Sequence, residues 1–212
     1  MHIAIPLYPR FTALDAVGPY QVLSFAPGCT VTFVAAEPGP VGDDHGTFLL
    51  TATASYEDVP APDVIVVPGG SGTFEALADA DLVAWIKRAD QHTRWTTSVC
   101  SGSLLLGAAG LLQGLKATSH WALLDELRRY GAEPVSERVV TSGKTVTAAG
   151  VSAGIDMALT LLAQAQDVET AQSVQLLIEY DPQPPFDSGS PKSAPEGLAE
   201  RALSLLPSPT PS

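Results

Sequence analysis

The sequence predicts an α/β fold with a mostly parallel central sheet. Short apolar runs alternate with longer stretches whose apolar residues recur every three or four positions, as in strands that alternate with helices. The run 63–68 is almost wholly apolar, which is typical of a parallel strand covered on both faces. The chain has 212 residues, about one domain, and its 45% hydrophobic residues are enough for a large core.

Four strands and a hairpin are expected in this sheet. The strands are predicted at 2–7, 30–36, 63–68 and 95–99. The second is rich in β-branched residues and is bounded by turn signals at Gly28 and 38–40. A β-hairpin is predicted at 139–147, with its turn at Ser142-Gly143.

Six helices fill the intervals, and a proline-rich segment follows them. The helices are predicted at 15–25, 73–90, 101–109, 119–130, 152–164 and 167–179. Asp79 and Asp167 stand where N-terminal caps are expected. Because eight of the eighteen prolines lie in the last 32 residues, we expect an α/β domain over 1–180 and a surface-wrapping extension over 181–206, helical only at 195–206. Residues 207–212 are expected to form a disordered tail.

The composition excludes several classes of partner. The net charge of −12 and the pI near 4.5 disfavour nucleic acids and anionic membranes. No apolar run reaches the ~20 residues that span a bilayer, and the N-terminus lacks a signal-peptide pattern, so a soluble cytoplasmic protein is expected. Cys29 and Cys100 should then be free thiols. Two cysteines and four histidines without HxH or HExxH spacing predict no metal site.

Cys100 stands between the end of an apolar strand and a helix that opens with Ser101 and two further small residues. This pattern is typical of a nucleophile elbow, which presents a reactive side chain at the carboxyl edge of the sheet. Helix N–H groups and the helix dipole predict a pKa of the thiol below its usual value of about 8.5. The alternative is that Cys100 is a small buried hydrophobic residue. Cys29 is expected to be structural.

A second strand-to-helix turn runs through 68–73. Its glycines, Gly70 and Gly72 among them, indicate exposed backbone N–H groups that can stabilise negative charge. The turn fits neither the dinucleotide pattern GxGxxG, because residue 75 is Glu, nor a phosphate-binding loop, which needs Gly-Lys-Ser/Thr. A tight turn without a catalytic role is the alternative.

Two further residues are candidates for the site. Asp15 follows the first strand and either caps the next helix or points at Cys100. In the second case the two acidic groups would have separated pKa values, and a protonated carboxyl could donate a proton. His120 opens a helix and either pairs with the thiol or lines the pocket. Asp156, on an apolar helix, is expected to pack or to form hydrogen bonds.

Five segments together resemble the ThiJ/PfpI superfamily of class I glutamine-amidotransferase-like proteins, and within it the isonitrile hydratase family. They are LDAVGPYQVL (14–23), VVPGGSGT (66–73), SVCSGSLLLGAAGLLQGLKATSHW (98–121), TAAGVSAGIDMALTLLA (147–163) and EYDPQPPFDSGSP (179–191). The resemblance implies a flavodoxin-like three-layer sandwich with a cysteine nucleophile elbow. It also implies a homodimer that acts on a small molecule without metal or organic cofactor.

The resemblance implies a lyase reaction, the hydration of an isonitrile to an N-substituted formamide. Cys100 would attack the isonitrile carbon, and Asp15 would donate a proton to complete a thioimidate and then activate water. Ser101 stands where isonitrile hydratases commonly have Thr, so the hydroxyl is kept and a methyl group is lost. Proteases and deglycases of the superfamily have a His at this position, which disfavours those activities here.

Backbone groups and alternatives complete the expected site. N–H groups near Gly70 and Gly72 would orient the substrate or stabilise charge, and the helix that opens at Gly150 and Val151 would contact the sulfur. Two alternatives stay open: another enzyme of the superfamily, glyoxalase-like or amide-hydrolysing, and a non-catalytic redox or stress sensor whose Cys100 is oxidised to sulfinic acid. The related AraC-type regulators share the stretch 117–121, but the acidic charge and proline-rich end predict no DNA-binding module.

Overall fold

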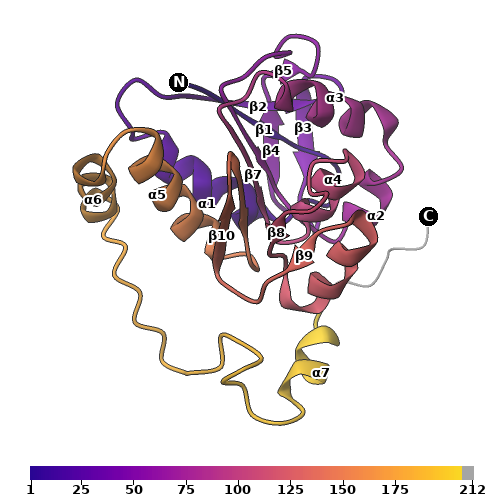
Figure 1. The fold of residues 1–212 in the computed structure, drawn as a ribbon, viewed down its shortest axis with the longest axis vertical. Helices are drawn as coiled ribbons and strands as arrows, with labels where there is room; N and C mark the ends of the chain where they lie inside the picture. The colour runs from indigo at the N-terminus through magenta and orange to yellow at the C-terminus, as the bar shows by residue number, and fades with distance from the viewer. Residues whose placement is uncertain (207–212) are drawn as a thin grey trace.

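The computed structural model describes residues 1–206 and places a seven-stranded sheet between layers of helices (Figure 1). The strands of this sheet are β1 (His2–Pro6), β2 (Thr30–Ala35), β5 (Ala54–Ser55), β6 (Val64–Val67), β7 (Trp95–Val99), β10 (Val139–Ser142) and β11 (Thr145–Ala148). Their order is β10-β11-β7-β6-β1-β2-β5, and neighbours are parallel except for the antiparallel pair β10 and β11. The mostly parallel α/β fold expected from the sequence is confirmed.

Helices cover both faces of the sheet, so its central strands are buried. On one side lie α1 (Ala13–Leu23), α5 (Ala153–Ala165) and α6 (Val168–Leu177), and on the other α2 (Thr73–Ala76), α3 (Ala80–Asp90), α4 (Gly102–Ala108) and the 3-10 helix η1 (Trp121–Tyr130) (Figure 1). All four residues of β6 are fully buried, which explains its continuous apolar sequence. The carboxyl ends of β1, β6, β7 and β11 meet at one edge, where the candidate site lies.

The four predicted strands are confirmed, whereas two details of the other elements are wrong. The expected helix over 73–90 is broken into α2 and α3, because Asp79 accepts the N–H groups of Asp81 and Leu82 at 3.0 Å and starts a new helix. The hairpin turn is one residue later than expected. Ser142 pairs with Thr145, so the turn residues are Gly143 and Lys144.

A second hairpin, β3 (Gly39–Gly42) and β4 (Leu49–Ala52), is absent from the sequence prediction, which read 38–40 as a plain turn. Asp43 closes its connection, because its Oδ1 accepts the N–H of His45 at 3.3 Å and of Phe48 at 3.2 Å. The hairpin places residues 43–44 against the loop that follows β1, where the N–H of Asp44 donates to the carbonyl of Phe11 at 3.0 Å.

The remaining described elements are a two-stranded sheet and the C-terminal segment. The small sheet pairs β8 (Lys116–Ala117) with β9 (Glu133–Pro134). Residues 181–189 are exposed and lead to α7 (Leu198–Leu203), which is shorter than the predicted helix over 195–206 (Figure 1). The predicted tail over 207–212 lies outside the described residues. Among residues 1–206, no helix has the length and apolar character needed to cross a membrane.

Candidate active site

Cys100 lies in the turn between β7 and α4, and its φ of +58° puts it in the left-handed region. This conformation is uncommon for a residue with a side chain, and it is held by hydrogen bonds on both sides. The N–H of Cys100 donates to the carbonyls of Ala148 and Ala149 at 3.1 and 3.0 Å. Its carbonyl accepts the hydroxyls of Ser103 and Ser119 at 3.1 and 3.0 Å. The geometry is consistent with a nucleophile elbow.

Glycines allow two backbone segments, the end of β6 and the start of α4, to meet at this turn. A Cβ at Gly102 would lie 2.1 Å from the carbonyl oxygen of Val67, and a Cβ at Gly69 would lie 2.5 Å from the N and Oγ of Ser101. Both distances are far inside van der Waals contact. Position 102 must therefore stay glycine if α4 is to start directly beside β6.

The first prediction concerns this close approach. Gly102→Ala is expected to lower the free energy of unfolding by about 3 kcal/mol, because the new methyl group forces backbone apart rather than a flexible side chain. Chemical denaturation of both proteins measures the difference. Gly189→Ala is the control, since a Cβ there meets nothing within 4 Å. Equal stability of the wild type and Gly102→Ala would contradict the close packing.

Asp15 is fully buried in the first turn of α1, but it does not cap that helix. Thr12 is the N-cap residue, and Oδ2 of Asp15 instead accepts the N–H of Gly69 at 2.9 Å. Its other oxygen, Oδ1, is buried and has no hydrogen-bond partner of normal geometry among residues 1–206. The capping alternative is therefore wrong, and the carboxyl belongs to the site at the sheet edge.

The two acidic groups of the site influence each other. Burial raises the pKa of Asp15 to about 7; the Gly69 N–H lowers it, the charge of Asp44 raises it, and hydrogen bonding with the Cys100 side chain lowers it. Burial, followed by the charge of Asp15, raises the pKa of Cys100 to about 12. Hydrogen bonds from the N–H groups of Val151 and Ser101 and from the Ser101 side chain lower this pKa, but by less.

One expectation about these groups is therefore wrong and the other is confirmed. The thiol pKa was expected below its usual value, but burial and the neighbouring carboxyl outweigh the donors at the start of α4. The expected separation of the two pKa values is present. Because the two groups interact, their pKa values describe the pair and not either residue alone. Between about pH 7 and about pH 12, Asp15 and Cys100 therefore share a single proton.

A chain of buried hydroxyl groups fixes Ser101. Its Oγ accepts the N–H of Gly70 at 3.0 Å and lies 2.7 Å from Oγ1 of Thr73. That oxygen lies 3.0 Å from the hydroxyl of Tyr8, which donates to the carbonyl of Pro68 at 2.9 Å. Burial raises the pKa of Tyr8 well above its usual range, so it remains a neutral hydroxyl. The Ser101 hydroxyl is thus held beside the thiol.

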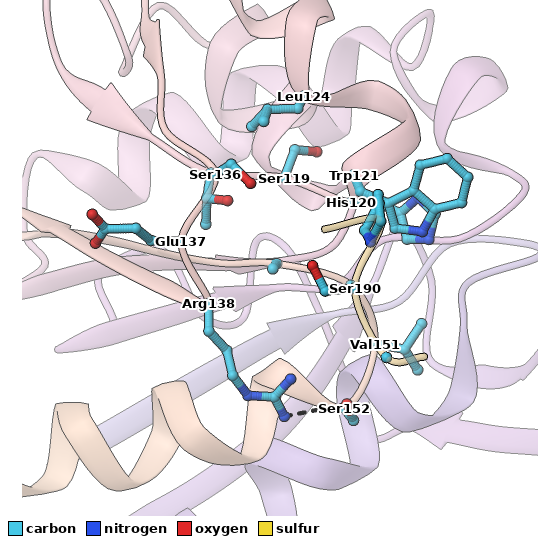
Figure 2. Close-up of a pocket in the computed structure, with 15 residues that line it drawn as sticks. Ser119, His120, Trp121, Leu124, Ser136, Glu137, Arg138, Val151, Ser152 and Ser190 are labelled. Atoms are coloured by element: carbon cyan, nitrogen blue, oxygen red, sulfur yellow. Dashed lines mark hydrogen bonds between the residues drawn. The ribbon is translucent and has the colours of Figure 1, made fainter. Parts of the chain in front are cut away.

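A cavity of about 380 Å³ adjoins the elbow (Figure 2). Its walls come from four segments: 118–121 with Leu124, 136–138, 149–152 and 189–191. Figure 2 shows His120 and Trp121 on one side of the cavity and Arg138 and Ser152 on the other. The guanidinium of Arg138 donates a hydrogen bond of 3.2 Å to Oγ of Ser152. Cys100 itself is only 7% exposed and is not among the described residues that line this cavity. Val151 connects the two, because it lines the cavity and its N–H bonds to Cys100.

His120 supports the second of its two expected roles. It lines the cavity, its ring lies against Gly150, and its Nδ1 accepts the N–H of Ala122 at 3.3 Å. Burial lowers its pKa, so the ring is neutral at physiological pH. Within the described part of the chain, no hydrogen bond joins His120 to Cys100. The residue lines the pocket, and the structure does not bring it into a hydrogen-bonded pair with the thiol.

A family model described as the DJ-1/PfpI family matches residues 1–164. The chain belongs to the DJ-1/PfpI family. Isonitrile hydratase of Pseudomonas putida is 46% identical over 202 residues, which cover 95% of this chain and 88% of that protein. The crystal structure of a ThiJ/PfpI family protein from Pseudomonas syringae has a TM-score of 0.92 at 41% identity and covers 96% of this chain and 85% of that one.

A more distant relative shares the fold. Oxidised DJ-1 of Toxoplasma gondii has a TM-score of 0.76 at 25% identity, and the match covers 85% of this chain and 99% of that one. The resemblance deduced from the sequence segments is therefore confirmed, both for the DJ-1/PfpI family and for its flavodoxin-like fold.

Two glycines of this DJ-1/PfpI protein do not offer the free N–H groups that the sequence predicted. The N–H of Gly70 donates to Ser101 Oγ, and the N–H of Gly72 donates to the carbonyl of Arg10 at 3.0 Å. Both are used to hold the turn against neighbouring segments. The donors beside the sulfur are instead the N–H groups of Ser101 and Val151, of which Val151 was expected.

Four residues of the DJ-1/PfpI site were missed by sequence reasoning: Tyr8, Asp44, Thr73 and Ser119. Tyr8 and Thr73 carried a usable signal, since each follows a strand that ends at the same edge of a parallel sheet. Asp44 carried none, because it lies in the hairpin that the sequence did not predict. Asp156 has the expected hydrogen-bonding role, through an ion pair with Arg138 and a bond from Tyr180.

Proposed function

We propose that this protein is an isonitrile hydratase, a lyase-type enzyme that adds water to an isonitrile, R–N≡C, to give the formamide R–NH–CHO. The similarity to the Pseudomonas putida enzyme over nearly the whole chain supports the proposal. The observation that carries it is the buried pair: a carboxyl with a raised pKa lies beside a thiol and forms a hydrogen bond with it. Such a pair can move one proton between sulfur and substrate.

The first step joins the sulfur of Cys100 to the terminal carbon of the isonitrile. The thiol proton passes to Asp15 as the C–S bond forms, and Asp15 delivers it to the same carbon, which gives the thioimidate R–N=CH–S. No proton enters from solvent, because the pair already holds it. The N–H groups of Ser101 and Val151 stabilise the negative charge on the sulfur during the transfer.

The second step uses the carboxylate that the first step leaves. Asp15 takes a proton from water as the water oxygen bonds to the thioimidate carbon, and it gives that proton to the nitrogen. The resulting R–NH–CH(OH)–S collapses as the C–S bond breaks, and the hydroxyl proton returns to the pair. The product is the formamide, and the thiol and carboxylate are restored. No metal or redox partner is needed for this balance.

The direct test is product formation from a simple aryl isonitrile. The purified protein is expected to yield the aryl formamide, with the formyl oxygen labelled when the reaction is run in ¹⁸O-water. Nuclear magnetic resonance and mass spectrometry identify the product. Methylglyoxal serves as the competing substrate for a glyoxalase-like activity. Turnover of methylglyoxal without any formamide would sink the proposal.

We further propose that the enzyme acts as a cytoplasmic homodimer without metal or organic cofactor. The cytoplasm keeps Cys29 and Cys100 reduced. Val168, Leu176 and Leu177 leave large apolar side chains exposed along α6, an area that a second copy would cover. Light scattering is expected to give twice the 22.0 kDa mass of the chain.

The hydroxyl of Ser101 gives the next prediction. Ser101→Ala is expected to lower kcat by roughly 10- to 100-fold, because a buried donor to a charged sulfur contributes about 1.5–3 kcal/mol. Ser101→Thr keeps the hydroxyl and is expected to retain most of the activity. Steady-state kinetics on the aryl isonitrile compare the three proteins. Equal rates for Ser101→Ala and the wild type would remove the hydroxyl from the mechanism.

A further inference from the structure

Asp44 is a half-buried carboxylate that joins two loops of the active site. It lies in the connection between β3 and β4. Its Oδ2 accepts the hydroxyl of Thr12 at 2.6 Å, and its Oδ1 accepts the N–H of Ser71 at 2.6 Å. Its backbone N–H is fixed as well, on the carbonyl of Phe11. Each carboxylate oxygen therefore accepts one hydrogen bond, and the two donors, Thr12 and Ser71, are about sixty residues apart in the sequence.

The two partners of Asp44, Thr12 and Ser71, lie in the chain segments that position Asp15 and Ser101 beside the thiol. Thr12 is the N-cap residue of α1, whose first turn contains Asp15. Ser71 lies in the turn whose Gly69 donates to Asp15 and whose Gly70 donates to Ser101. The N–H of Thr12 also donates to the carbonyl of Gly69 at 2.8 Å. The side chain of Asp44 thus adds a second link, beside these direct bonds, between the loop of the proton carrier and the loop of the hydroxyl donor.

Asp44 also contributes charge to the surroundings of Asp15. The groups that act on that carboxyl are the Gly69 N–H, the charge of Asp44 and the Cys100 thiol, with Tyr8 as a neutral hydroxyl nearby. Arg10 is the positively charged residue closest to Asp15 in the sequence, and its guanidinium is paired with Glu75 at 3.2 Å. The negative charge of Asp44 therefore opposes ionisation of Asp15 and raises its pKa.

We propose that Asp44 is a positioning residue of the active site: through Thr12 and Ser71 it ties the loop of Asp15 to the loop of Ser101, and it places a negative charge at that junction. Its importance for isonitrile hydration rests on the function proposed above. Its effect on Asp15 does not, so the two can be tested separately. The role differs from catalysis, because Asp44 acts through Thr12, Ser71 and Asp15 and contacts no reacting atom.

The test titrates Asp15 directly and by activity. The protonated carboxyl of Asp15 gives an infrared carbonyl band, which is identified by its absence from Asp15→Asn. In the wild type this band should disappear with a midpoint near pH 7. Formation of the single-proton pair means that kcat/KM should rise through the same midpoint. Asp44→Asn keeps an acceptor for the Ser71 N–H and removes the charge, so both midpoints should fall by about half a pH unit or more.

Two matched variants separate charge from hydrogen bonding. Thr12→Val removes one bond of Asp44 and leaves its charge, so kcat should fall several-fold while the midpoints stay in place. Glu57→Gln removes an exposed carboxylate that does not act on Asp15, and it should change neither quantity. Circular dichroism confirms that each variant is folded.

Each outcome decides the proposal. A lower infrared midpoint in Asp44→Asn, together with an unchanged midpoint in Glu57→Gln, supports the proposal. This holds even if no variant makes formamide, in which case only the proposed function fails. An unchanged midpoint in folded Asp44→Asn overturns the role of the charge. An unchanged kcat in Thr12→Val overturns the role of the tie between the loops. If Asp44→Asn does not fold, the wild-type midpoint is followed as salt is added, because salt should screen the charge of Asp44 and lower that midpoint. A midpoint that does not change with salt would overturn the role of the charge.

Discussion

Asp15→Asn is expected to abolish formamide formation, with kcat lowered by about 10⁴-fold or more, because the same carboxyl moves the proton in both steps and a single general acid–base contributes about 10²–10⁴. The amide can accept the N–H of Gly69 as Asp15 does, so the loop should keep its place. It cannot take the thiol proton or pass one to the substrate carbon.

The same substitution, Asp15→Asn, should increase stability at neutral and alkaline pH although it abolishes activity. Since burial raises the pKa of Asp15 from 3.8 to about 7, the folded protein keeps a proton that the unfolded chain loses between these values. The wild type therefore loses stability as pH rises from about 4 to about 7, on the order of 4 kcal/mol from this group. The amide carries no such penalty. At about pH 8, Asp15→Asn should be the more stable protein.

The measurements are formamide yield at several pH values and urea unfolding at about pH 4 and pH 8. Glu57→Gln provides an exposed carboxyl-to-amide control, which should alter neither activity nor stability. An active Asp15→Asn enzyme would remove the proton carrier from the mechanism. A stability difference that does not depend on pH would show that the wild-type carboxyl is ionised at no cost.

Cys100→Ala is expected to leave no detectable hydration, because without sulfur the thioimidate cannot form and water alone must attack the isonitrile. Removal of the nucleophile from the Ser-His-Asp triad of a serine protease, where it also acts with a proton carrier, lowers kcat by roughly 10⁶-fold. The fold should persist, since the backbone bonds of position 100 do not involve the thiol.

Cys29→Ser is the matched control for this cysteine. Cys29 is half-buried, and its sulfur accepts a weak hydrogen bond from Gln166 at 3.5 Å. It lies far from the elbow in the sequence and has no part in the proposed mechanism. It should keep wild-type activity. Mass spectrometry of the wild type quenched during turnover should find the isonitrile mass added to the peptide that contains Cys100 and not to the one with Cys29. Formamide production by Cys100→Ala would refute covalent catalysis.

The sequence predicted the parallel strands well because their determinants are local. Val64–Val67 is apolar throughout, and only a strand covered on both faces needs that. Cys100 was found for the same reason: a strand, a nucleophilic residue and a run of small residues are contiguous in the chain. The helix break at Asp79 and the turn at Gly143 were less well placed, since boundaries depend on single caps and registers.

The β3–β4 hairpin shows where local patterns were insufficient. Its strands are four residues each, contain Gly39 and Pro40, and are only partly buried, so neither length nor alternation distinguishes them from a loop. What stabilises them is contact with the loop after β1, through Phe11 and Asp43–Asp44. Asp44 could not be identified as part of the site without that contact.

The sequence by itself determined the α/β class and the family, and it named Cys100 and Asp15 as candidate site residues, because all of these depend on contiguous motifs. Tertiary structure alone decided that the Asp15 side chain accepts the N–H of Gly69 instead of capping its helix, that His120 lines the cavity, and that the pKa of the thiol rises. The physical reason is that the pKa of a buried group reflects desolvation and charges gathered from distant segments. A helix N-terminus predicts stabilisation of a thiolate, but the burial that outweighs it exists only in the folded chain.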